Sequence, residues 1–347
     1  MKHILEFGCL IVILKLYSMR PIEIKNHHLR KSILRLRLSF MRYGDFHGHK
    51  SVILENEHFQ LECLAQAGPR VVRLIPLWTG ENLFAEVPNV TTKTQTGEFH
   101  YFGGHRLWYA PESLSHTYYP DSHGISIKEV QDGLRLIGMD EPGTGIRKTV
   151  TIQISPNRSF LILKHKLQNH GQVAVRLAPW AITMMRPMGT AILPQQHGNI
   201  DEDGLLPNRR LALWPYSRWN DPRLQLADEF IIVKSDSDSH PLKLGYFNPH
   251  GWLGYLYDDV FFVKRFGVRR DKEYADYGSN SEIYTNHRAT ELESLGPIVD
   301  LHPREDVVHT ETWEVYRDTE IPKELFGGKT LDEILNKHPN QNQGTEG

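Results

Sequence analysis

The sequence has 347 residues, of which 39% are apolar and 24% are charged, a composition typical of a folded protein with enough apolar material for a core. Large β-sandwiches and barrels often reach this size as one domain, so the length does not require two domains. The formal net charge is only −2, and the sequence has no basic stripe and no known nucleic-acid-binding motif, which argues against a nucleic acid as partner.

The first 40 residues differ from the rest in charge and pattern. Residues 1–42 contain nine of the 40 Lys+Arg and two of the 42 Asp+Glu, a net charge of +7, which leaves −9 for the remainder. The apolar run 7–14 is far shorter than the roughly 20 residues that a membrane span needs, and no small-residue cleavage site follows it. We therefore predict a basic extension over 1–40 that adds little to the core, no membrane span, and a cytoplasmic location.

From residue 41 onward the sequence is typical of short strands separated by turns. Segments 51–54, 58–64 and 70–75 are predicted strands, and the turns between them carry Glu55-Asn56 and Gly68-Pro69. Segments 125–130 and 134–138 flank Asp132-Gly133, a dipeptide that favours a tight hairpin because it tolerates positive φ. The pattern predicts an antiparallel meander and not an alternation of strands and helices.

The clearest alternation of apolar and polar residues runs from 160 to 168, where Leu161, Leu163, His165 and Leu167 face one way. Segment 173–177 repeats the pattern after a turn, so we predict that the two pair antiparallel. Further strands are predicted at 230–233, 253–257 and 312–316. The predicted fold class is therefore mainly β, a sandwich or barrel.

The C-terminal region carries the clearest helix signal. Thr330-Leu331-Asp332-Glu333 is a capping box, in which the threonine and glutamate side chains bond each other's backbone N–H groups. It predicts a short helix before a polar tail. We therefore divide the chain into the extension 1–40, a β-sandwich domain 41–320, and a helix with its tail over 321–347.

Segment 102–112 is the first of three segments that we interpret as functional loops. Its paired glycines, Gly103 and Gly104, would let the backbone approach a ligand closely. Arg106 can bind hydroxyls or carboxylates, and Trp108 offers a flat apolar face to a sugar ring. A glycine turn with a core tryptophan and a surface arginine is an equally good interpretation.

The other two segments are 280–297 and 177–187. In the first, Glu291 and Glu293 would share a face of a strand, and a carboxylate held among His and Arg side chains such as Arg288 can act as a general base. A solvated edge strand is the alternative. In the second segment, Trp180 is either a core residue or a stacking platform.

Metal and nucleotide chemistry find little support in the sequence. His47 and His49 lie two residues apart, but none of the usual zinc-ligand spacings is present. No nucleophile elbow and no phosphate-binding glycine loop occur either. We therefore predict no metal and no cofactor.

At these segments the sequence resembles the galactose-mutarotase-like superfamily, in particular a branch that shares the stretches GGHRLW-x-APE, here 103–112, and ELESLGP, here 291–297. The resemblance covers about 43–317 and implies an antiparallel β supersandwich with a sugar site on one concave face. Leu292-Glu293-Ser294 resembles the Leu-Glu-Pro of aldose 1-epimerases, which implies Glu293 as the base that accepts the proton of the anomeric hydroxyl.

A second part of the resemblance concerns histidines. Residues 120–124 resemble the Pro-x-x-His-Gly of hexose-phosphate mutarotases, which implies that His123 contacts the sugar. Where epimerases carry Asn-His after a Val-x-Leu strand, this chain has Pro179-Trp180, so the histidine that protonates the ring oxygen is missing. Mutarotation would then need His105 or His123 as the acid.

Two functions remain open at this point. The first is a carbohydrate-active enzyme, an aldose 1-epimerase relative or a lyase- or hydrolase-like variant, with Glu293 as base. The second is a non-catalytic sugar-binding module with Trp108 and Trp180 as stacking platforms and Arg106 and Glu112 as polar anchors. In both, the expected partner is a small sugar or an oligosaccharide, and the sequence predicts no oligomeric state.

Overall fold

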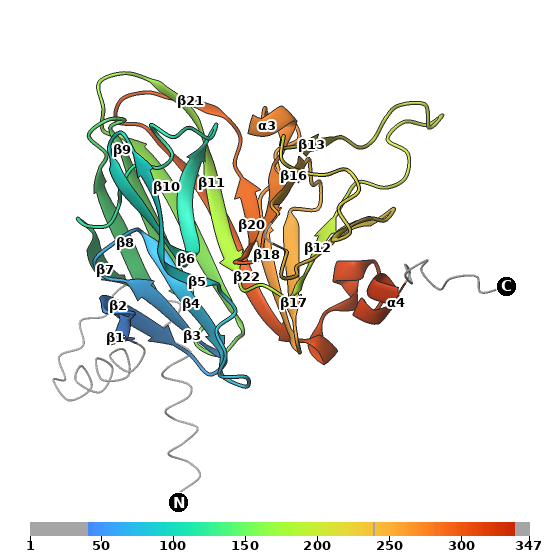
Figure 1. Cartoon of the computed structure of the whole chain (residues 1–347), viewed down its shortest axis with the longest axis horizontal. Coiled ribbons are helices and arrows are strands. Elements are labelled where there is room, and N and C mark those ends of the chain that lie inside the picture. The colour runs from blue at the N-terminus through green and yellow to red at the C-terminus, as the bar shows by residue number, and fades with distance from the viewer. Residues whose placement is uncertain (1–40, 239, 337–347) are drawn as a thin grey trace, which may run out of the picture. The chain divides into compact units, whose positions relative to one another are not determined.

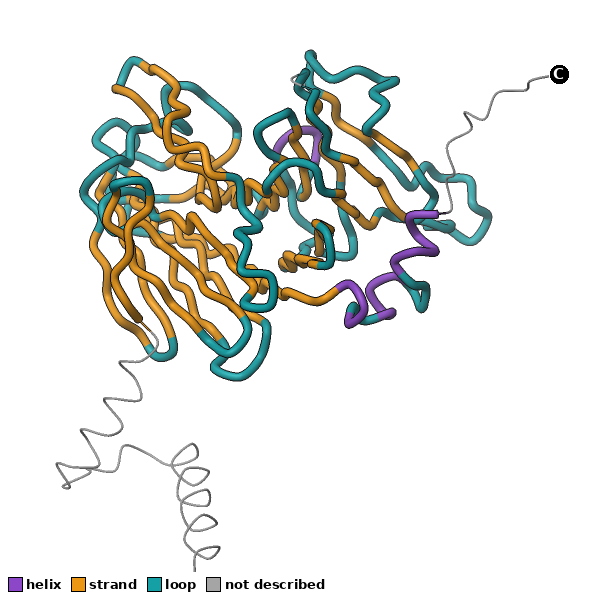
Figure 2. The backbone as a smooth tube through the Cα atoms, turned by 60° about the horizontal axis from the view of Figure 1, so that its bottom comes forward, coloured by secondary structure: helices purple, strands orange, loops and turns teal. Residues whose placement is uncertain are grey.

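The computed structural model describes residues 41–238 and 240–336, and this part of the chain consists mainly of antiparallel strands in two sheets (Figures 1 and 2). The predicted mainly β fold is therefore confirmed. The predicted extension 1–40 and the tail 337–347 lie outside the described residues. Among the described residues, no helix is long and apolar enough to cross a membrane.

The first sheet has twelve strands in the described part, in the order β1-β2-β3-β4-β6-β11-β20-β19-β16-β13, with β5 paired to β6 and β21 paired to β11. Their bounds are β1 Met41–Phe46, β2 His49–Glu55, β3 Phe59–Leu64, β4 Arg70–Pro76, β5 Glu86–Thr94, β6 Gly97–Ala110, β11 Val175–Met185, β13 Leu211–Leu213, β16 Leu242–Tyr246, β19 Ser281–Thr285, β20 Thr290–Leu295 and β21 Val299–Leu301.

The second sheet has ten strands in the described part, in the order β14-β15-β12-β17-β18-β22-β10-β9-β8-β7. Their bounds are β7 Ser126–Val130, β8 Gly133–Asp140, β9 Ile146–Ile154, β10 Phe160–Asn169, β12 Thr190–Pro194, β14 Leu224–Leu226, β15 Phe230–Lys234, β17 Trp252–Tyr257, β18 Val260–Phe266 and β22 Asp306–Arg317. The helical turns are α3 Ala275–Gly278, η1 Asp318–Glu320, η2 Lys323–Phe326 and α4 Leu331–Asn336.

The main core lies between the two sheets and follows from strand alternation. In β10, Leu161, Leu163, His165 and Leu167 are buried, and Lys164 on the other face is exposed, as the alternation predicted. Apolar residues of both sheets complete one continuous cluster around the fully buried Trp313 of β22. Burial of this apolar surface, at about 25 cal/mol per Å², supplies the main driving force for packing the sheets.

The hairpin and the C-terminal helix are confirmed. Gln131 and Asp132, the latter with φ of 55°, connect β7 and β8, and Gly133 begins β8 opposite Val130. Thr330 donates its backbone N–H to the Glu333 carboxylate at 2.7 Å, and the backbone N–H of Glu333 donates to Thr330 Oγ1 at 3.3 Å, so the capping box forms. The segment that ends in α4 packs Phe326 and Ile334 on apolar residues of the second sheet.

The predicted pairing of 160–168 with 173–177 is wrong. β10 pairs with β9 and β22, whereas β11 lies in the other sheet between β6 and β20. The connection between them crosses from sheet to sheet, and Asn169 fixes this corner because its side-chain amide donates to the carbonyls of Val173 and Leu301, each at 2.8 Å. Alternation shows which face of a strand is buried, but it does not specify the partner strand.

The paired glycines of β6 have a structural role. Gly103 and Gly104 have φ of 100° and 65°, and a Cβ atom on either one would lie 2.0 Å from the carbonyl oxygen of Ala85 or Val71. At this point β6 changes partner, from β5 to β4 and β11. Only glycine allows neighbouring backbone so close in this conformation, so the pair serves strand packing and not the close approach of a ligand.

Candidate functional site

Strands β6, β11 and β20 lie side by side in the first sheet and bring together the three segments singled out in the sequence (Figure 1). Arg106 of β6 lies opposite Ile182 of β11, which lies opposite Glu293 of β20. Residues directly opposite each other in antiparallel strands share a face of the sheet. Trp108 and Trp180 also lie opposite each other and, two residues along, share that face with Arg106 and Glu293.

The three segments are strands and not loops, which corrects the interpretation from sequence. Segment 102–112 lies mostly in β6, 177–187 mostly in β11, and 280–297 forms the hairpin of β19 and β20. Every residue of β20 is buried, so the alternative of a solvated edge strand is also wrong. The polar side chains are therefore mounted on a rigid central part of the sheet.

This face of the sheet is hollowed into an open cleft with a volume of about 500 Å³. Strands β5, β6, β11, β16, β19 and β20 contribute to its lining, together with the segments that follow β6, β13 and β19. Among the described residues, the aromatic side chains of the lining are Tyr101, Trp108, Tyr118, Trp180, Trp214, Tyr216 and Tyr284, and the charged ones are Arg106, Glu112, Lys243, Arg288 and Glu291. Apolar walls with a few placed polar groups are typical of small-ligand sites.

Arg106 and Glu291 form an ion pair on the floor of the cleft. Arg106 Nη2 donates to both carboxylate oxygens of Glu291, at 3.1 and 3.3 Å, and the guanidinium lies 4.2 Å from the ring centre of Trp108. Burial raises the pKa of Glu291, and the positive charge of Arg106 opposes this shift. Nε and Nη1 of Arg106 are buried and have no hydrogen-bond partner among the described residues, so they could bond a ligand oxygen if the ligand displaced the side chains that cover them.

Lys243 connects the cleft to two carboxylates beneath it. Its Nζ lies 2.9 Å from a carboxylate oxygen of Glu282 and 3.0 Å from one of Glu293, and Trp180 Nε1 donates to Glu293 at 2.8 Å. Burial alone would lower the pKa of Lys243, but the two carboxylates raise it well above its ordinary value. Burial also raises the pKa of Glu282. Lys243 is therefore a protonated cation and not a free amine nucleophile.

Trp108 and Trp180 form the floor of the cleft and are each only 2% exposed. Cations occupy their faces: the guanidinium of Arg106 lies over Trp108, and Lys243 Nζ lies 4.6 Å from the ring centre of Trp180. Neither indole presents a free face of the kind that a sugar ring stacks on. Tyr216, which is 38% exposed, is a more accessible platform.

Glu112 and Arg288 are exposed residues of the cleft lining. Glu112 accepts a hydrogen bond of 2.5 Å from the hydroxyl of Tyr118, another lining residue. Arg288 lies in the turn between β19 and β20 and donates through Nε to the ring of His287. Both side chains are accessible to a ligand, in contrast to the buried ion pairs of the floor.

Glu293, His105 and His123 are not among the residues that line the cleft. Glu293 is 0% exposed and lies beneath Lys243 and Trp180. His105 precedes Arg106 in β6 and so points to the opposite face, between the sheets. His123 is exposed in the connection from β6 to β7. Among the described residues, no histidine contributes to the lining, so the structure brings neither a histidine acid nor Glu293 into the cleft.

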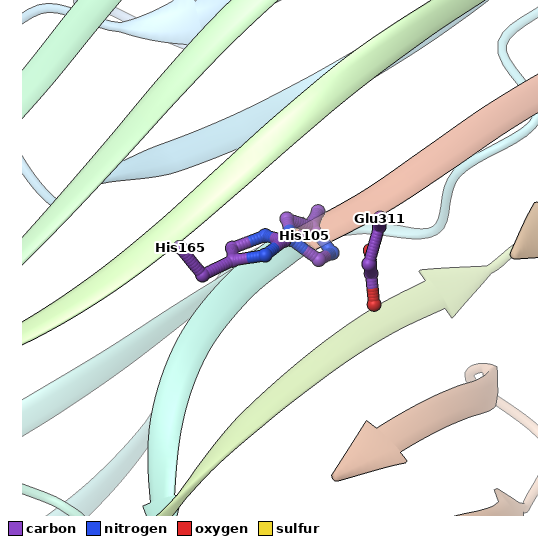
Figure 3. A group of neighbouring side chains, drawn as sticks. All are labelled: His105, His165 and Glu311. Carbon is purple, nitrogen blue, oxygen red and sulfur yellow. The ribbon is translucent and has the colours of Figure 1, made fainter. Parts of the chain in front are cut away.

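A buried polar network lies between the sheets, behind the cleft floor, and Figure 3 shows its His105 and His165 rings pointing toward each other. Their Nε2 atoms are 2.7 Å apart. His165 Nδ1 donates to the carbonyl of His309, so its Nε2 accepts from His105, whose Nδ1 then accepts from the hydroxyl of Thr183. These assignments make both rings neutral, in agreement with the lowering of their pKa by burial.

The network continues through an ion pair. Lys264 Nζ lies 2.9 Å from Glu311 and also donates to Thr183 Oγ1 at 3.1 Å. Glu311 accepts further bonds from Ser294 Oγ and from Trp313 Nε1. Sequence patterning placed only His165 on an apolar strand face, because the other members of the network come from strands far apart in the chain.

The network also contains a candidate for metal binding. Ligand atoms of His105, His165 and Glu311 all lie within 4.8 Å of one another. However, the two ring nitrogens already bond each other, and Lys264 places a positive charge against the carboxylate. A divalent cation would have to displace both interactions and would meet the charge of Lys264 in a buried site. The residues therefore fit a closed hydrogen-bonded network better than a metal centre.

Sequence reasoning missed several cleft residues. Lys243 was not singled out, although a lysine between two leucines indicates a strand whose polar side chain lies opposite the apolar face. Trp214-Pro215-Tyr216 follows the short strand β13, and an aromatic pair in a turn is a signal that could have been noticed. Tyr284 lies directly opposite both Lys243 and Glu291 in the sheet, which only the register reveals.

Comparison with known proteins identifies the fold. No protein-family model matches the sequence, and no curated protein matches it. A TPR-domain-containing protein from Parabacteroides distasonis is similar, with 12% identity and a TM-score of 0.53. The match covers 85% of this chain but only 50% of that protein.

Two further structures are similar over nearly their whole length. A galactose mutarotase-like protein from Lactobacillus casei has 10% identity and a TM-score of 0.51, over 77% of this chain and 100% of that one. YeaD of Salmonella typhimurium, a proposed mutarotase, has 10% identity and a TM-score of 0.50. That match covers 88% of this chain and 99% of YeaD. The chain therefore has a galactose-mutarotase-like fold, as the resemblance in its sequence implied.

Proposed function

We propose that the cleft binds a carbohydrate. The observation that carries this proposal is the pairing, in one open cleft, of aromatic side chains with charged groups that retain bonding capacity, above all Arg106. The C–H faces of sugar rings stack on aromatic rings, and sugar hydroxyls need donors and acceptors placed among them. The galactose-mutarotase-like fold supports the proposal, although fold alone does not specify function.

Tyr216→Ala is the variant that tests carbohydrate binding most directly. Because Tyr216 lines the cleft and is already 38% exposed, its loss should weaken sugar binding about fivefold to tenfold without unfolding the protein. Calorimetric titration with a panel of neutral and acidic monosaccharides measures the dissociation constants. Tyr43→Ala, at an 81% exposed tyrosine of β1, is the matched control and should change nothing.

Two results would contradict the proposal. The first is a wild-type protein that binds no monosaccharide of this panel and no oligosaccharide built from its members. The second is a Tyr216→Ala protein that binds as tightly as the wild type, together with a cleft variant, Arg106→Gln, that also retains full affinity while remaining folded.

Interconversion of anomers is a second candidate function, and one observation favours it. Glu293 Oε1 is buried and has no hydrogen-bond partner among the described residues, whereas its other oxygen is held by Lys243 and Trp180. A carboxylate oxygen with free lone pairs, on the same sheet face as the cleft, can accept a proton if a bound sugar displaces the residues above it. As the anomeric hydroxyl gives its proton to Glu293, the bond between the anomeric carbon and the ring oxygen breaks, and the ammonium of Lys243 would stabilise the negative charge on the ring oxygen until the ring closes again and the proton returns.

Polarimetry on freshly dissolved α-anomers of the sugars that bind tests this second function. The wild-type protein is expected to accelerate mutarotation above the buffer rate, and Glu293→Gln is expected to abolish the acceleration, because an amide cannot accept the proton but keeps the shape. Retained sugar binding by Glu293→Gln is the necessary control. A wild-type protein that binds a sugar and leaves its mutarotation at the buffer rate would contradict this second function and favour a binding module, and a lyase or hydrolase role would need its own assay.

A further inference from the structure

The segment between β12 and β15 displays an exposed tryptophan close to the cleft. This segment contains only the two three-residue strands β13 and β14, and Figure 1 shows its first part extending beyond β13. Trp214 and Tyr216, just after β13, line the cleft. Trp219, three residues further on, is 81% exposed.

The backbone before Trp219 is fixed to the cleft. Ser217 N donates to the carbonyl of Trp214 at 2.9 Å, and Ser217 Oγ donates to the carbonyl of the cleft residue Lys243 at 2.6 Å. Lys243 N in turn donates to Ser217 Oγ at 2.8 Å. Because two peptide units span at most about 7 Å, the Cα atom of Trp219 lies within that distance of Ser217. Trp219 is therefore near the end of the cleft that Lys243 and Tyr216 line.

The backbone after Trp219 is fixed as well. Asp221 N donates to the carbonyl of Arg218 at 3.3 Å, and the buried Asp221 carboxylate pairs with Arg223 at 2.7 Å. Arg223 also donates to the carbonyl of His240 at 2.8 Å. The short stretch 218–220 is thus held at both ends. An indole presented from a fixed turn loses little conformational freedom when a ligand stacks on it.

The size of the cleft favours a ligand larger than one sugar ring. A hexose occupies roughly 180 Å³, about six times the ~30 Å³ of a water molecule in the liquid. The cleft, at about 500 Å³ and open to solvent, has room for more than one such ring. A chain of linked sugars that fills the cleft and leaves it past Tyr216 would reach the neighbourhood of Trp219.

We infer that the ligand is an oligosaccharide, and that Trp219 forms an outer subsite on which a sugar unit beyond those in the cleft stacks. This inference rests on the proposed carbohydrate function and names the class of its ligand. It separates two groups of residues: Arg106 and Tyr216 contact the units in the cleft, whereas Trp219 contacts only the continuation of the chain.

The test uses ladders of linked sugars, from monomer to hexamer, of β-1,4-glucose, α-1,4-glucose, β-1,4-N-acetylglucosamine and α-1,4-galacturonate. Calorimetric titration of the full-length protein should show, for the ladder that binds best, an affinity that rises at least tenfold from dimer to tetramer. Trp219→Ala should lower the affinity for the tetramer about fivefold to tenfold and leave that for the monomer and dimer unchanged. Tyr216→Ala should weaken every member, and Tyr43→Ala none.

The outcomes distinguish this inference from the function on which it rests. If monomer and hexamer bind equally, or Trp219→Ala leaves the tetramer affinity unchanged, the outer subsite is wrong and carbohydrate binding stands. If no member of any ladder binds, the proposed function itself is wrong. If Trp219→Ala instead changes the mass of the protein in sedimentation without affecting the length dependence, Trp219 is a contact between protein copies and the inference is overturned.

Discussion

Lys264→Met is expected to destabilise the protein by about 3–5 kcal/mol, because it leaves the Glu311 carboxylate buried without its cation. Lys264 and Glu311 are both 0% exposed and lie 2.9 Å apart. The ammonium also donates to the carbonyls of Ala181 in β11, at 2.7 Å, and of Leu292 in β20, at 3.1 Å. It thus ties the two strands that carry Trp180, Glu291 and Glu293 to the opposite sheet. Urea unfolding gives the free energy.

Two further variants separate loss of the charge pair from loss of packing. The double variant Lys264→Met/Glu311→Gln removes both charges and should recover part of the stability, since no buried charge remains unpaired. Lys166→Met removes a lysine that pairs with Asp306 at 3.5 Å on the surface, and it should cost less than about 1 kcal/mol. A Lys264→Met protein as stable as Lys166→Met would show that the buried pair contributes nothing.

The sequence predicts strands well where only one strand has to be considered. The alternation in β10, the hairpin at Asp132-Gly133 and the capping box at Thr330 depend on residues close together in the chain, and all three are confirmed. The pairing of β10 with β11 was predicted by the same local reasoning and is wrong, because the corner at Asn169 sends the chain into the other sheet.

The candidate site could also be predicted only where residue type alone was informative. Arg106, Trp108, Trp180 and Glu291 were selected by residue type, and they do lie in one cleft because their strands are neighbours. Lys243 was missed because its importance comes from carboxylates about 40 and 50 residues later, which only the register of β16, β19 and β20 places beside it. His105 was assigned to the cleft by motif, yet one position in a strand separates the cleft face from the core face.

Acidification is expected to destabilise the protein through the histidines of the buried network. Burial lowers the pKa of His105 and His165, and it lowers the pKa of His309 to about 3 from an ordinary value of 6.5. A histidine with a lowered pKa in the folded state binds protons mainly when unfolded, so stability falls as the pH drops below about 6.5. Each such histidine contributes up to about 1.4 kcal/mol per pH unit.

Three buried carboxylates also change how the stability depends on pH, and the direction of each effect follows from the shift of its pKa. Glu311 is buried, but Lys264 holds its pKa below the ordinary value of 4.5, so its contribution is present above about pH 4.5 and lost as the pH falls below that. Burial raises the pKa of Glu282 and Glu291, and these groups bind protons more readily in the folded state, which offsets part of the loss above pH 4.5. The wild-type slope is therefore smaller than the three histidines alone would give.

His309→Gln isolates one histidine from this sum. His309 Nε2 donates to Ser294 Oγ at 2.7 Å, and a glutamine amide can donate in its place without titrating. Urea unfolding at pH 7.5, 6.5, 5.5 and 4.5 should show that this variant loses up to about 1.4 kcal/mol less stability per pH unit than the wild type between pH 6.5 and 4.5. His302→Gln, at an exposed histidine, is the matched control and should keep the wild-type slope. If His309→Gln and the wild type lose stability in parallel over this range, His309 does not stay neutral in the folded protein and its assigned part in the pH dependence is wrong.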